Sequence, residues 1–259
     1  MSDDIHVQLA RAGKVVPLDL WVKAGFDKVS NGACPACHQV FLILLLKSED
    51  PQLQFNVKTT TLANPSPEFK RCGLRHVPGI VHGDESYDML DEILEYVDSS
   101  FPTVPLQYFN PEAETAAMDV FSKFCWFIKD VNKNPKFLEA ELRKLNAYLL
   151  SEDHGGAKFL CGNAMCHLDA SMLPKLHHIR VACSYLKSFE IPTHLTGLWR
   201  YLANGYADEK FVRSCPSDQE IILHWAERQD TVNLPGNKIA ELANQRPQFS
   251  QQLPNGVTV

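Results

Sequence analysis

The sequence predicts an α/β domain of about one hundred residues followed by an all-helical domain. Three observations carry this prediction. Strand and helix patterns alternate up to about residue 100, and only helical periodicity follows residue 115. Between them, Phe101 to Glu114 contains three prolines and is typical of an ordered linker. A chain of 259 residues is long enough for two such domains.

The first elements are predicted from alternation, proline and capping signals. Leu18 to Val22 alternates apolar and polar side chains, as a strand covered on one face does. A helix is predicted after Pro35, because a proline at the first helical position lacks only an N–H that has no partner there. The next strand is predicted over Gln54 to Thr59, and Ser66 is expected to cap a short helix that Gly73 ends.

The α/β domain is completed by a hairpin and a helix. Gly79 to Ser86 predicts a strand that turns back through Gly83 and Asp84. An amphipathic helix follows, because apolar residues recur at i, i+3, i+4 and i+7: Leu90, Ile93, Leu94 and Val97. The order β-α-β-α-β-β-α is that of a thioredoxin-like sheet. The fold class predicted is therefore an α/β thioredoxin-like N-terminal domain plus an all-α C-terminal domain.

The domain boundaries follow from these patterns. We expect an N-terminal extension over 1–17, a thioredoxin-like domain over 18–100, a linker over 101–114, a helical domain over 115–243 and a flexible tail over 244–259. The helical domain is predicted to hold about five or six helices. One spans residues 115–130, and a long one is expected to kink at Pro174. The tail lacks periodicity and is expected to be mobile.

Composition and charge exclude several classes of protein. With 45 % hydrophobic and 22 % charged residues and a net charge of −6, the chain reads as soluble and not as a nucleic-acid binder. The acidic opening is unlike a signal peptide, which predicts a cytoplasmic protein whose eight cysteines are thiols. The longest apolar run, Val40 to Leu46, is far shorter than the roughly 20 residues that span a bilayer.

The stretch Cys34-Pro35-Ala36-Cys37-His38 is the main chemical signal, and it admits four interpretations. It matches a haem attachment pattern, but haem attachment needs an exported or organellar context. It supplies three zinc ligands where about four are needed; the only other cluster is Cys161-x4-Cys166-His167. The two cysteines are otherwise a redox dithiol or ordinary buried residues. The redox interpretation fits best, so neither metal nor haem is expected.

A strand, a loop and then two cysteines at a helix start give the redox interpretation its physical basis. The free N–H groups and the helix dipole stabilise a Cys34 thiolate. Cys37, one turn further, is placed to resolve a mixed disulfide. His38 is expected to be solvated or packed and not to act as a base.

Two further features are expected near the thiol. The Val77-Pro78 bond precedes the third strand, where thioredoxin-like folds usually have a cis proline that aims backbone groups at a bound peptide. Glu85 and Ser86 are expected just before the fourth helix, where a hydroxyl and free N–H groups bind a carboxylate or simply cap the helix. Cys34, Val77 and Ser86 together suggest a grip on a small acidic thiol tripeptide.

Over residues 18–228 the sequence resembles the chloride intracellular channel family, a branch of the glutathione-transferase-like proteins that is similar to the omega class. The motifs that carry the resemblance are "LWVKAG", "CPACHQVFLILLLK", "VPGI", "ETAAMDVFSKFCWFIKD", "FLCGNAM", "LPKLH", "TGLWRYLANGY" and "CPSDQEI". The resemblance implies a glutaredoxin-like Cys34, a cis Pro78 and a glutathione site between the domains. It also implies that the chain leaves its soluble fold, inserts into membranes and conducts anions.

This chain departs from the family pattern at several positions. Ala36 replaces a bulky aromatic, and Cys37 opens a dithiol route that serine-bearing relatives lack. Cys166 stands where a Ser or Thr would cap a helix three residues before Asp169, and a thiol is a weak acceptor. Cys72, six residues before Pro78, is a candidate oxidative partner for Cys34.

Membrane insertion is the hardest implication to reconcile with the residues. The inserting segment corresponds to residues 34–61 and carries four charges: Lys47, Glu49, Asp50 and Lys58. Each costs about 2.5–3.5 kcal/mol near the bilayer centre.

The sequence predicts a weak glutathione-dependent oxidoreductase with catalytic Cys34 and Cys37, and a glutathione site of Cys34, Val77, Pro78, Glu85 and Ser86. Its expected partners are glutathione or protein thiols, membrane lipids by resemblance alone, and unidentified proteins. The alternative is a non-catalytic scaffold at membranes or cytoskeleton.

Overall fold

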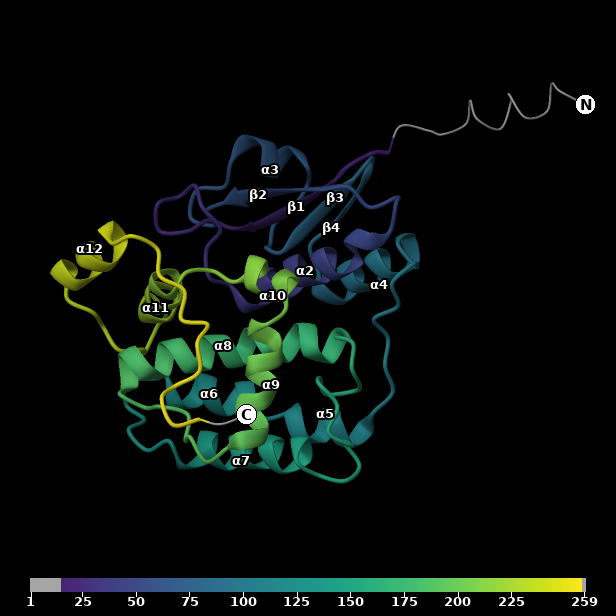
Figure 1. The fold of residues 1–259 in the computed structure, drawn as a ribbon. Coiled ribbons are helices and arrows are strands. Elements are labelled where there is room, and N and C mark those ends of the chain that lie inside the picture. Colours follow the sequence, from purple (N-terminus) through teal and green to yellow (C-terminus); the bar gives the residue numbers. More distant parts are fainter. Residues whose placement is uncertain (1–14, 258–259) are drawn as a thin grey trace, which may run out of the picture.

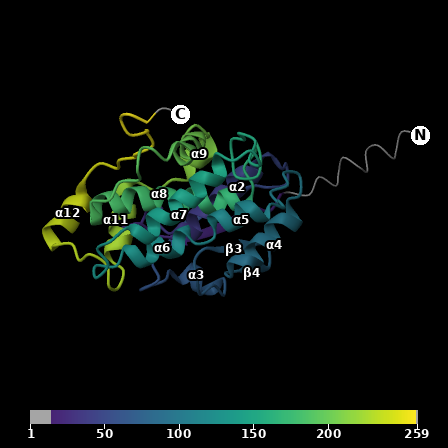
Figure 2. The ribbon, with the colours of Figure 1, turned by 90° about the horizontal axis from the view of Figure 1, so that it is seen from below.

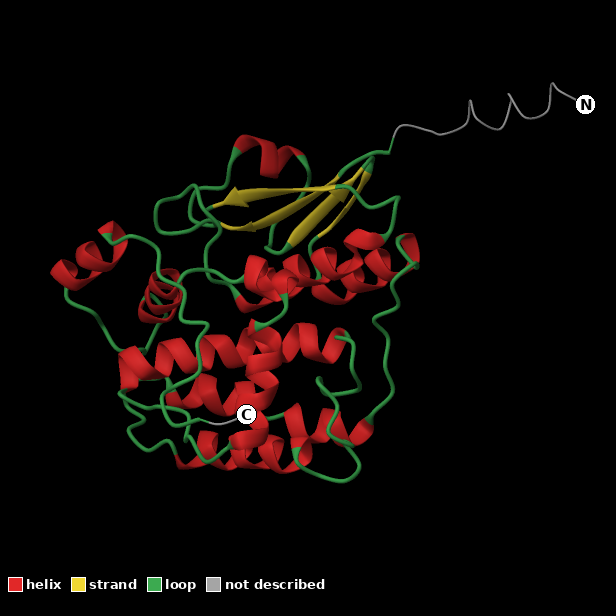
Figure 3. Ribbon diagram, in the orientation of Figure 1, coloured by secondary structure: helices red, strands yellow, loops and turns green. Residues whose placement is uncertain are grey.

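A computed structural model describes residues 15–257 of the chain. A small sheet with its helices forms one layer, and a larger group of helices forms a second layer beneath it (Figure 1). All strands of the named sheet lie in the upper layer (Figure 3). Residues 1–14 of the expected extension and 258–259 of the expected tail lie outside the described residues.

The upper layer contains the elements predicted for the first domain, in the predicted order. Its strands are β1 Leu18–Lys23, β2 Phe55–Thr60, β3 Gly79–His82 and β4 Glu85–Tyr87. Its helices are α2 Pro35–Leu46, η1 Lys47–Glu49, α3 Pro67–Arg71 and α4 Leu90–Ser100. The strand order is β2-β1-β3-β4, with β1 parallel to β2 and the other pairs antiparallel. The thioredoxin-like sheet predicted from the sequence is therefore confirmed.

The lower layer is helical, as predicted, but it is divided more finely. The helices of the second domain are α5 Pro111–Ala117, α6 Val120–Phe127, α7 Lys136–Leu149, α8 His167–Lys187, α9 Thr196–Tyr206, α10 Glu209–Ser214, α11 Asp218–Ala226 and α12 Gly236–Asn244. Helix α10 lies beside α2 and not in the lower layer (Figure 1). The single helix predicted over 115–130 is divided into α5 and α6, and residues 118–119 form a turn between them. Helix α5 also begins inside the expected linker.

Different helices lie at the two ends of the molecule. Helices α11 and α12 lie at one end, and α4 and α5 lie towards the other (Figures 1 and 2). The long helix α8 runs between them and continues through Pro174. The helix is continuous from His167 to Lys187, and the kink expected at Pro174 stays a prediction.

The apolar run Val40 to Leu46 is explained by the position of α2 between the sheet and α8 (Figure 1). The helix has no polar face in this stretch, and Val40, Leu42, Ile43 and Leu44 have no exposed surface. A helix that is apolar on all sides is buried on all sides. The run is therefore the core between the two domains.

The end of α2 is fixed by a buried cation. The Lys47 ammonium lies 2.9 Å from an Asp98 carboxylate oxygen and donates to the Phe101 and Val104 carbonyls at 2.9 Å each. The other Asp98 oxygen lies 2.7 Å from Nε2 of His167, at the start of α8. A buried charge is tolerated only when it is paired and hydrogen-bonded. This network joins α2, α4, the linker and α8.

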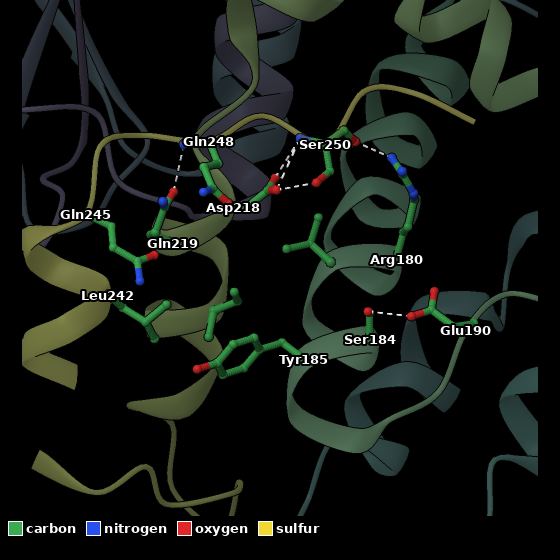
Figure 4. A pocket seen from close by; sticks show the side chains of 12 residues that line it. Arg180, Ser184, Tyr185, Glu190, Asp218, Gln219, Leu242, Gln245, Gln248 and Ser250 are labelled. Carbon is green, nitrogen blue, oxygen red and sulfur yellow. Dashed lines mark hydrogen bonds between the residues drawn. The ribbon is translucent and has the colours of Figure 1, made fainter. Parts of the chain in front are cut away.

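The segment after α12 is held against the helical layer, contrary to the expectation of a mobile tail. Asp218 accepts the Ser250 amide and hydroxyl, and the Asp218 amide donates to the Gln248 carbonyl at 2.8 Å. Arg180 donates to the Ser250 and Gln252 carbonyls. These contacts surround a cavity of about 250 Å³ between α8, α11 and α12 (Figure 4). Sequence periodicity does not reveal such a segment because its order comes from hydrogen bonds to distant helices.

The start of α8 is capped by Cys166, as the sequence predicts. The carboxylate of Asp169, in the first turn, accepts the Cys166 amide at 3.0 Å and its thiol at 3.1 Å. The thiol therefore serves mainly as a donor, and it is a weak acceptor for the orphan N–H groups of the first turn.

We expect Cys166→Thr to raise the melting temperature, because a hydroxyl both donates to Asp169 and accepts from the first turn. The expected gain in unfolding free energy is about 0.5–2 kcal/mol. Thermal denaturation followed by circular dichroism measures it, with Cys166→Ser as the control that adds no methyl group. Equal melting temperatures for all three proteins would show that the thiol caps as well as a hydroxyl.

Four buried histidines lie along the contact between the two layers: His38, His177, His178 and His224. The His178 ring lies 6.2 Å from the rings of both His38 and His224. Burial is the main cause that lowers the pKa of all four, to about 3 for His177 and His224. They are therefore neutral in the folded protein at neutral pH, whereas in the unfolded chain they titrate near pH 6.5.

The free energy of unfolding should be greatest above about pH 6.5 and fall as the pH drops toward 3, since the unfolded chain then binds more protons. Each extra proton contributes a slope of about 1.4 kcal/mol per pH unit. His177→Phe removes one of these histidines, so the slope should fall by the contribution of one proton. Tyr206 keeps the hydrogen bond that Arg180 donates to it at 3.0 Å. Denaturant unfolding at a series of pH values measures the slope, and an unchanged slope would contradict the assignment.

Candidate thiol site

Cys34 lies at the N-cap of α2, where the loop after β1 returns to the sheet. Its backbone is extended, with φ −121° and ψ 119°, and Pro35 occupies the first turn. The loop closes because the Gly32 amide donates to the Lys23 carbonyl at 2.8 Å. A Cβ on Gly32 would lie 2.4 Å from the Ala24 carbonyl oxygen, so the close approach requires glycine. The Cys34 side chain is partly buried.

The surroundings of Cys34 favour the thiolate. The pKa of Cys34 is lowered to about 6, chiefly because the Cys37 thiol donates a hydrogen bond to its sulfur. Burial opposes this shift, and the backbone N–H groups of Cys37 and Ala36 and the Lys23 charge support it. A pKa of about 6 favours the thiolate over the thiol at pH 7. The N–H groups of the first turn contribute less than the Cys37 thiol, and a reactive Cys34 stays a prediction.

Cys37 is the protonated member of the pair. It is buried, and burial together with the neighbouring Cys34 raises the pKa of its thiol well above the ordinary value. The Lys23 amide donates to its sulfur at 3.5 Å. The two thiols therefore hold different protonation states at neutral pH, which is the arrangement that thiol–disulfide exchange uses.

Lys23 connects the thiols to the helical layer, and the sequence analysis did not select it. Its ammonium lies 3.2 Å from Nδ1 of His224 in α11 and 3.6 Å from a carboxylate oxygen of Glu227, the residue that follows α11. His224 follows Lys23 by 201 positions in the chain, so no local pattern reveals the contact. The only local signal was a lysine at the end of the strand that leads to the thiol loop.

A cleft of about 650 Å³ opens beside Lys23, between the loop after β1, the loop after β2 and α11. Glu220 fixes one wall, because its carboxylate accepts the Phe26 amide at 2.8 and 3.1 Å. Residues of both charges and several apolar side chains line the cleft: Lys23, Phe26, Leu62, Glu220, His224 and Glu227. Lys23 lines this cleft and its backbone amide also donates to Cys37, so the cleft and the dithiol share one residue.

The Val77-Pro78 bond is cis, as predicted. Gly79 pairs with Trp21 in the sheet, which places Pro78 beside the end of β1. The loop before it is held by Asp88, whose carboxylate accepts the Arg75 and His76 amides at 2.6 and 3.0 Å. Asp88 is a second residue that the sequence analysis missed.

Glu85 and Ser86 are not at a helix start, which corrects the expected geometry. They belong to the exposed strand β4, where they pair with His82 and Val81. Helix α4 begins later, after an N-cap at Met89 whose side chain makes no capping bond. The hairpin through Gly83-Asp84 and the helix that contains Leu90 are formed as the sequence predicts, but two residues, Tyr87 and Asp88, separate Ser86 from the N-cap of α4. The N–H groups of α4 are therefore not adjacent to the Ser86 hydroxyl.

Cys72 and His38 also have defined places. Cys72 is the C-cap of α3 and packs with Trp21, Phe69 and Leu74 on the face of the sheet opposite to α2. The immediate neighbour of Cys34 is therefore Cys37, and a Cys34–Cys72 bond stays a prediction. His38 is buried and packed: its Nε2 lies 2.9 Å from the Ser214 hydroxyl.

Within residues 15–257 no group of three or more His, Cys, Asp or Glu is placed to hold a metal ion.

A thioredoxin-like sheet with a cysteine at the start of its first helix, packed on a helical domain, defines the class of glutathione-transferase-like proteins. Solved structures of other proteins have the same fold. The CLIC homologue EXC-4 from *Caenorhabditis elegans* matches with a TM-score of 0.78 and 26 % identity, over 94 % of this chain and 96 % of that one. *Chlamydomonas reinhardtii* dehydroascorbate reductase shares the fold, with a TM-score of 0.69 and 24 % identity over 82 % of this chain and 98 % of that one.

Sequence comparison identifies the family within this class. Residues 16–104 match the CLIC-like N-terminal domain. The chloride intracellular channel protein exl-1 of *Caenorhabditis elegans* is 38 % identical over 242 residues, which cover 89 % of this chain and 97 % of that protein. The chain belongs to the chloride intracellular channel family.

We expect Cys37→Ala to raise the pKa of Cys34, because it removes the strongest donor to the thiolate. Cys37→Ser, whose hydroxyl still donates, should leave the Cys34 pKa closer to about 6. The rate of alkylation of Cys34 as a function of pH measures both values. A midpoint near the ordinary thiol pKa in the unmodified protein would refute the thiolate assignment.

Proposed function

We propose that the protein is a thiol–disulfide oxidoreductase that uses glutathione, with Cys34 as its nucleophile. The observation that supports this proposal best is the ionised Cys34 thiol beside the protonated Cys37 thiol. A thiolate with a pKa just below neutral pH is both abundant and nucleophilic. Protein disulfides or small disulfides that enter the cleft beside Lys23 are the proposed substrates.

The proposed reaction begins with the Cys34 thiolate. It attacks one sulfur of the substrate disulfide, so that a Cys34 mixed disulfide forms and the other sulfur leaves as a thiolate that takes a proton from water. A glutathione thiolate then attacks the Cys34 sulfur or the substrate sulfur of this bond. In the first case the substrate leaves reduced, and a second glutathione restores Cys34 and yields oxidised glutathione.

Cys37 offers a second route to the same products. After deprotonation it attacks the Cys34 sulfur, releases the reduced substrate and leaves a Cys34–Cys37 disulfide that two glutathione molecules reduce. The raised pKa of Cys37 slows this route at neutral pH. Glutathione therefore competes well as the resolving thiol, and Cys37 serves mainly to stabilise the Cys34 thiolate.

Glutathione is proposed to place its sulfur at Cys34 and its backbone along Val77 and Pro78. Glu85 and Ser86 are the residues that the sequence suggests for its γ-glutamyl end, but the sheet register sets Ser86 level with Asp19, at the end of β1 away from the Cys34 loop. Ala36 is small and leaves space beside the thiol for the tripeptide or for a protein loop.

Chloride conduction, the activity in the names of the relatives, is proposed to require a change of fold in this chain. Among residues 15–257 no helix has the length and apolar character needed to cross a bilayer. The proposed inserting segment, residues 34–61, includes Lys47, whose charge is held by Asp98 and two carbonyls in this fold. Insertion, with membrane lipids as partners, must therefore separate α2 from α4 and α8 first.

Disulfide reduction coupled to glutathione tests the proposed activity. The unmodified protein should turn over, with a rate that falls as the pH drops through about 6, where Cys34 becomes protonated. Cys34→Ser should reduce turnover to the uncatalysed background, because a serine hydroxyl is not ionised at neutral pH.

Two variants serve as controls for this experiment. Cys37→Ser should keep turnover through glutathione, and Cys72→Ala should behave as the unmodified protein. Turnover in Cys34→Ser equal to that of the unmodified protein would contradict the assignment. Absence of turnover in every protein, with retained binding to membrane or cytoskeletal partners, would favour the scaffold function instead.

Chloride flux into liposomes tests conduction separately. Lys47→Met should increase flux relative to the unmodified protein, because it removes the buried charge that ties α2 to α4. Heat-denatured protein is the control for nonspecific leakage. Equal flux for the variant and the unmodified protein would show that release of α2 does not limit conduction.

A further inference from the structure

The segment after α12 contacts the helical layer in the way that a bound peptide contacts its receptor. Alternate residues of the segment use their backbone groups to bind α8 and the first turn of α11: Arg246, Gln248, Ser250 and Gln252. We propose that this surface is a binding groove for an extended peptide segment of another protein, and that residues 246–252 occupy it in cis. The groove contains none of the residues proposed for the thiol site, so this inference goes beyond the proposed activity.

The first turn of α11 binds the first part of the segment. Gln219 donates to the Arg246 carbonyl and accepts the Gln248 amide, at 2.9 Å each. The Asp218 amide donates to the Gln248 carbonyl at 2.8 Å. Both carboxylate oxygens of Asp218 lie 3.1 Å from the Ser250 amide, and one of them accepts the Ser250 hydroxyl. Contacts with the backbone of every second residue are those that a site for an extended chain makes, because side chains alternate in direction along such a chain.

Arg180 of α8 binds the second part of the segment. Its guanidinium donates to the Ser250 carbonyl and to the Gln252 carbonyl, the latter at 2.6 Å. The guanidinium carbon lies 5.8 Å from the centre of the Trp199 ring and 5.3 Å from that of Tyr206. The Tyr206 hydroxyl also accepts a hydrogen bond from Arg180 at 3.0 Å. Two rings of α9 therefore orient the planar guanidinium, whose several donors can bind two carbonyls of one chain.

The segment leaves part of the groove unfilled. Figure 4 shows Gln248 and Ser250 on one side of the cavity of about 250 Å³, with Tyr185 and Leu242 on the other. Apolar and aromatic side chains line much of this cavity: Val181, Tyr185, Ile222 and Leu242. The Gln248 side chain is exposed and brings only a polar amide to it. A large apolar side chain at this position would bury apolar surface that the glutamine does not.

These contacts define the chemistry of the partner. It is an extended segment with a large apolar side chain at the position of Gln248 and a serine or threonine at the position of Ser250. Asp218 accepts the hydroxyl of the second residue and disfavours an acidic side chain there. The partner competes with the cis segment, so its apparent Kd is the intrinsic Kd divided by the fraction of molecules whose groove is open.

Fluorescence anisotropy of a labelled peptide with the full-length protein tests the groove. The probe is the peptide of residues 246–253 with Gln248→Leu. The protein carries Ser250→Pro, which removes both the amide hydrogen and the hydroxyl that Asp218 accepts and so releases the cis segment. We expect this protein to bind the probe about tenfold more tightly than the unmodified protein does. Absence of binding to the Ser250→Pro protein would overturn the proposal.

Two further peptides test the specificity without any change to the protein. The peptide of natural sequence should bind about tenfold more weakly than the probe, because leucine buries apolar surface in the cavity. A probe that also carries Ser250→Pro should not bind. Equal affinities for all three peptides would contradict the groove. On the protein side, Arg180→Met added to Ser250→Pro should abolish binding, and unchanged affinity would refute the role of α8.

Light scattering distinguishes a partner peptide from the same segment of a second copy. We expect the molar mass of the unmodified protein not to change with its concentration. A dimer that forms at high concentration and is lost in Asp218→Ala would show that two copies exchange their C-terminal segments. That result would overturn the proposed partner.

Discussion

The burial of α2 on both of its faces is the constraint on which the rest of the structure depends. One side of this helix completes the sheet domain, and the other packs on α8. Because the helix is apolar all round, the two domains cannot separate without exposing it to water. Its two ends carry the polar chemistry: Cys34 at the N-terminus, where backbone N–H groups stabilise an anion, and Lys47 at the C-terminus, where Asp98 and two carbonyls hold a cation.

The same side chain behaves in opposite ways at the two cysteine pairs. Cys34 accepts hydrogen bonds from a thiol and from the first turn of a helix, close to a lysine, so its pKa falls. Cys161 is partly buried and Cys166 is buried, and burial, together with the nearby Asp169 carboxylate, raises the pKa of both thiols. The spacing of cysteines in the sequence does not distinguish the two environments. The two environments differ in the sign of the nearest charge and in the direction of the nearest backbone donors.

Membership of the chloride intracellular channel family accounts for the fold. In this chain the Cys37 thiol is the main donor to the Cys34 sulfur. Helix α4 begins after Met89 without a side-chain cap, and Ser86 lies in the preceding strand. Any carboxylate bound there would therefore rely on exposed β4 side chains, which are weaker and less directional than a helix N-terminus.

Patterns within a few residues determined the order of strands and helices in the first domain and the start of α2 at Cys34. The cap of α8 at Cys166 and the cis Val77-Pro78 bond were predicted from likeness to known folds. The sequence did not determine that Lys23 meets His224 and Glu227, that Asp88 holds the loop before Pro78, or that residues 248–252 bind α8 and α11. Nor did it place Ser86 correctly. Those contacts join segments distant in the chain, and only the packing of α2 between the two layers brings them together.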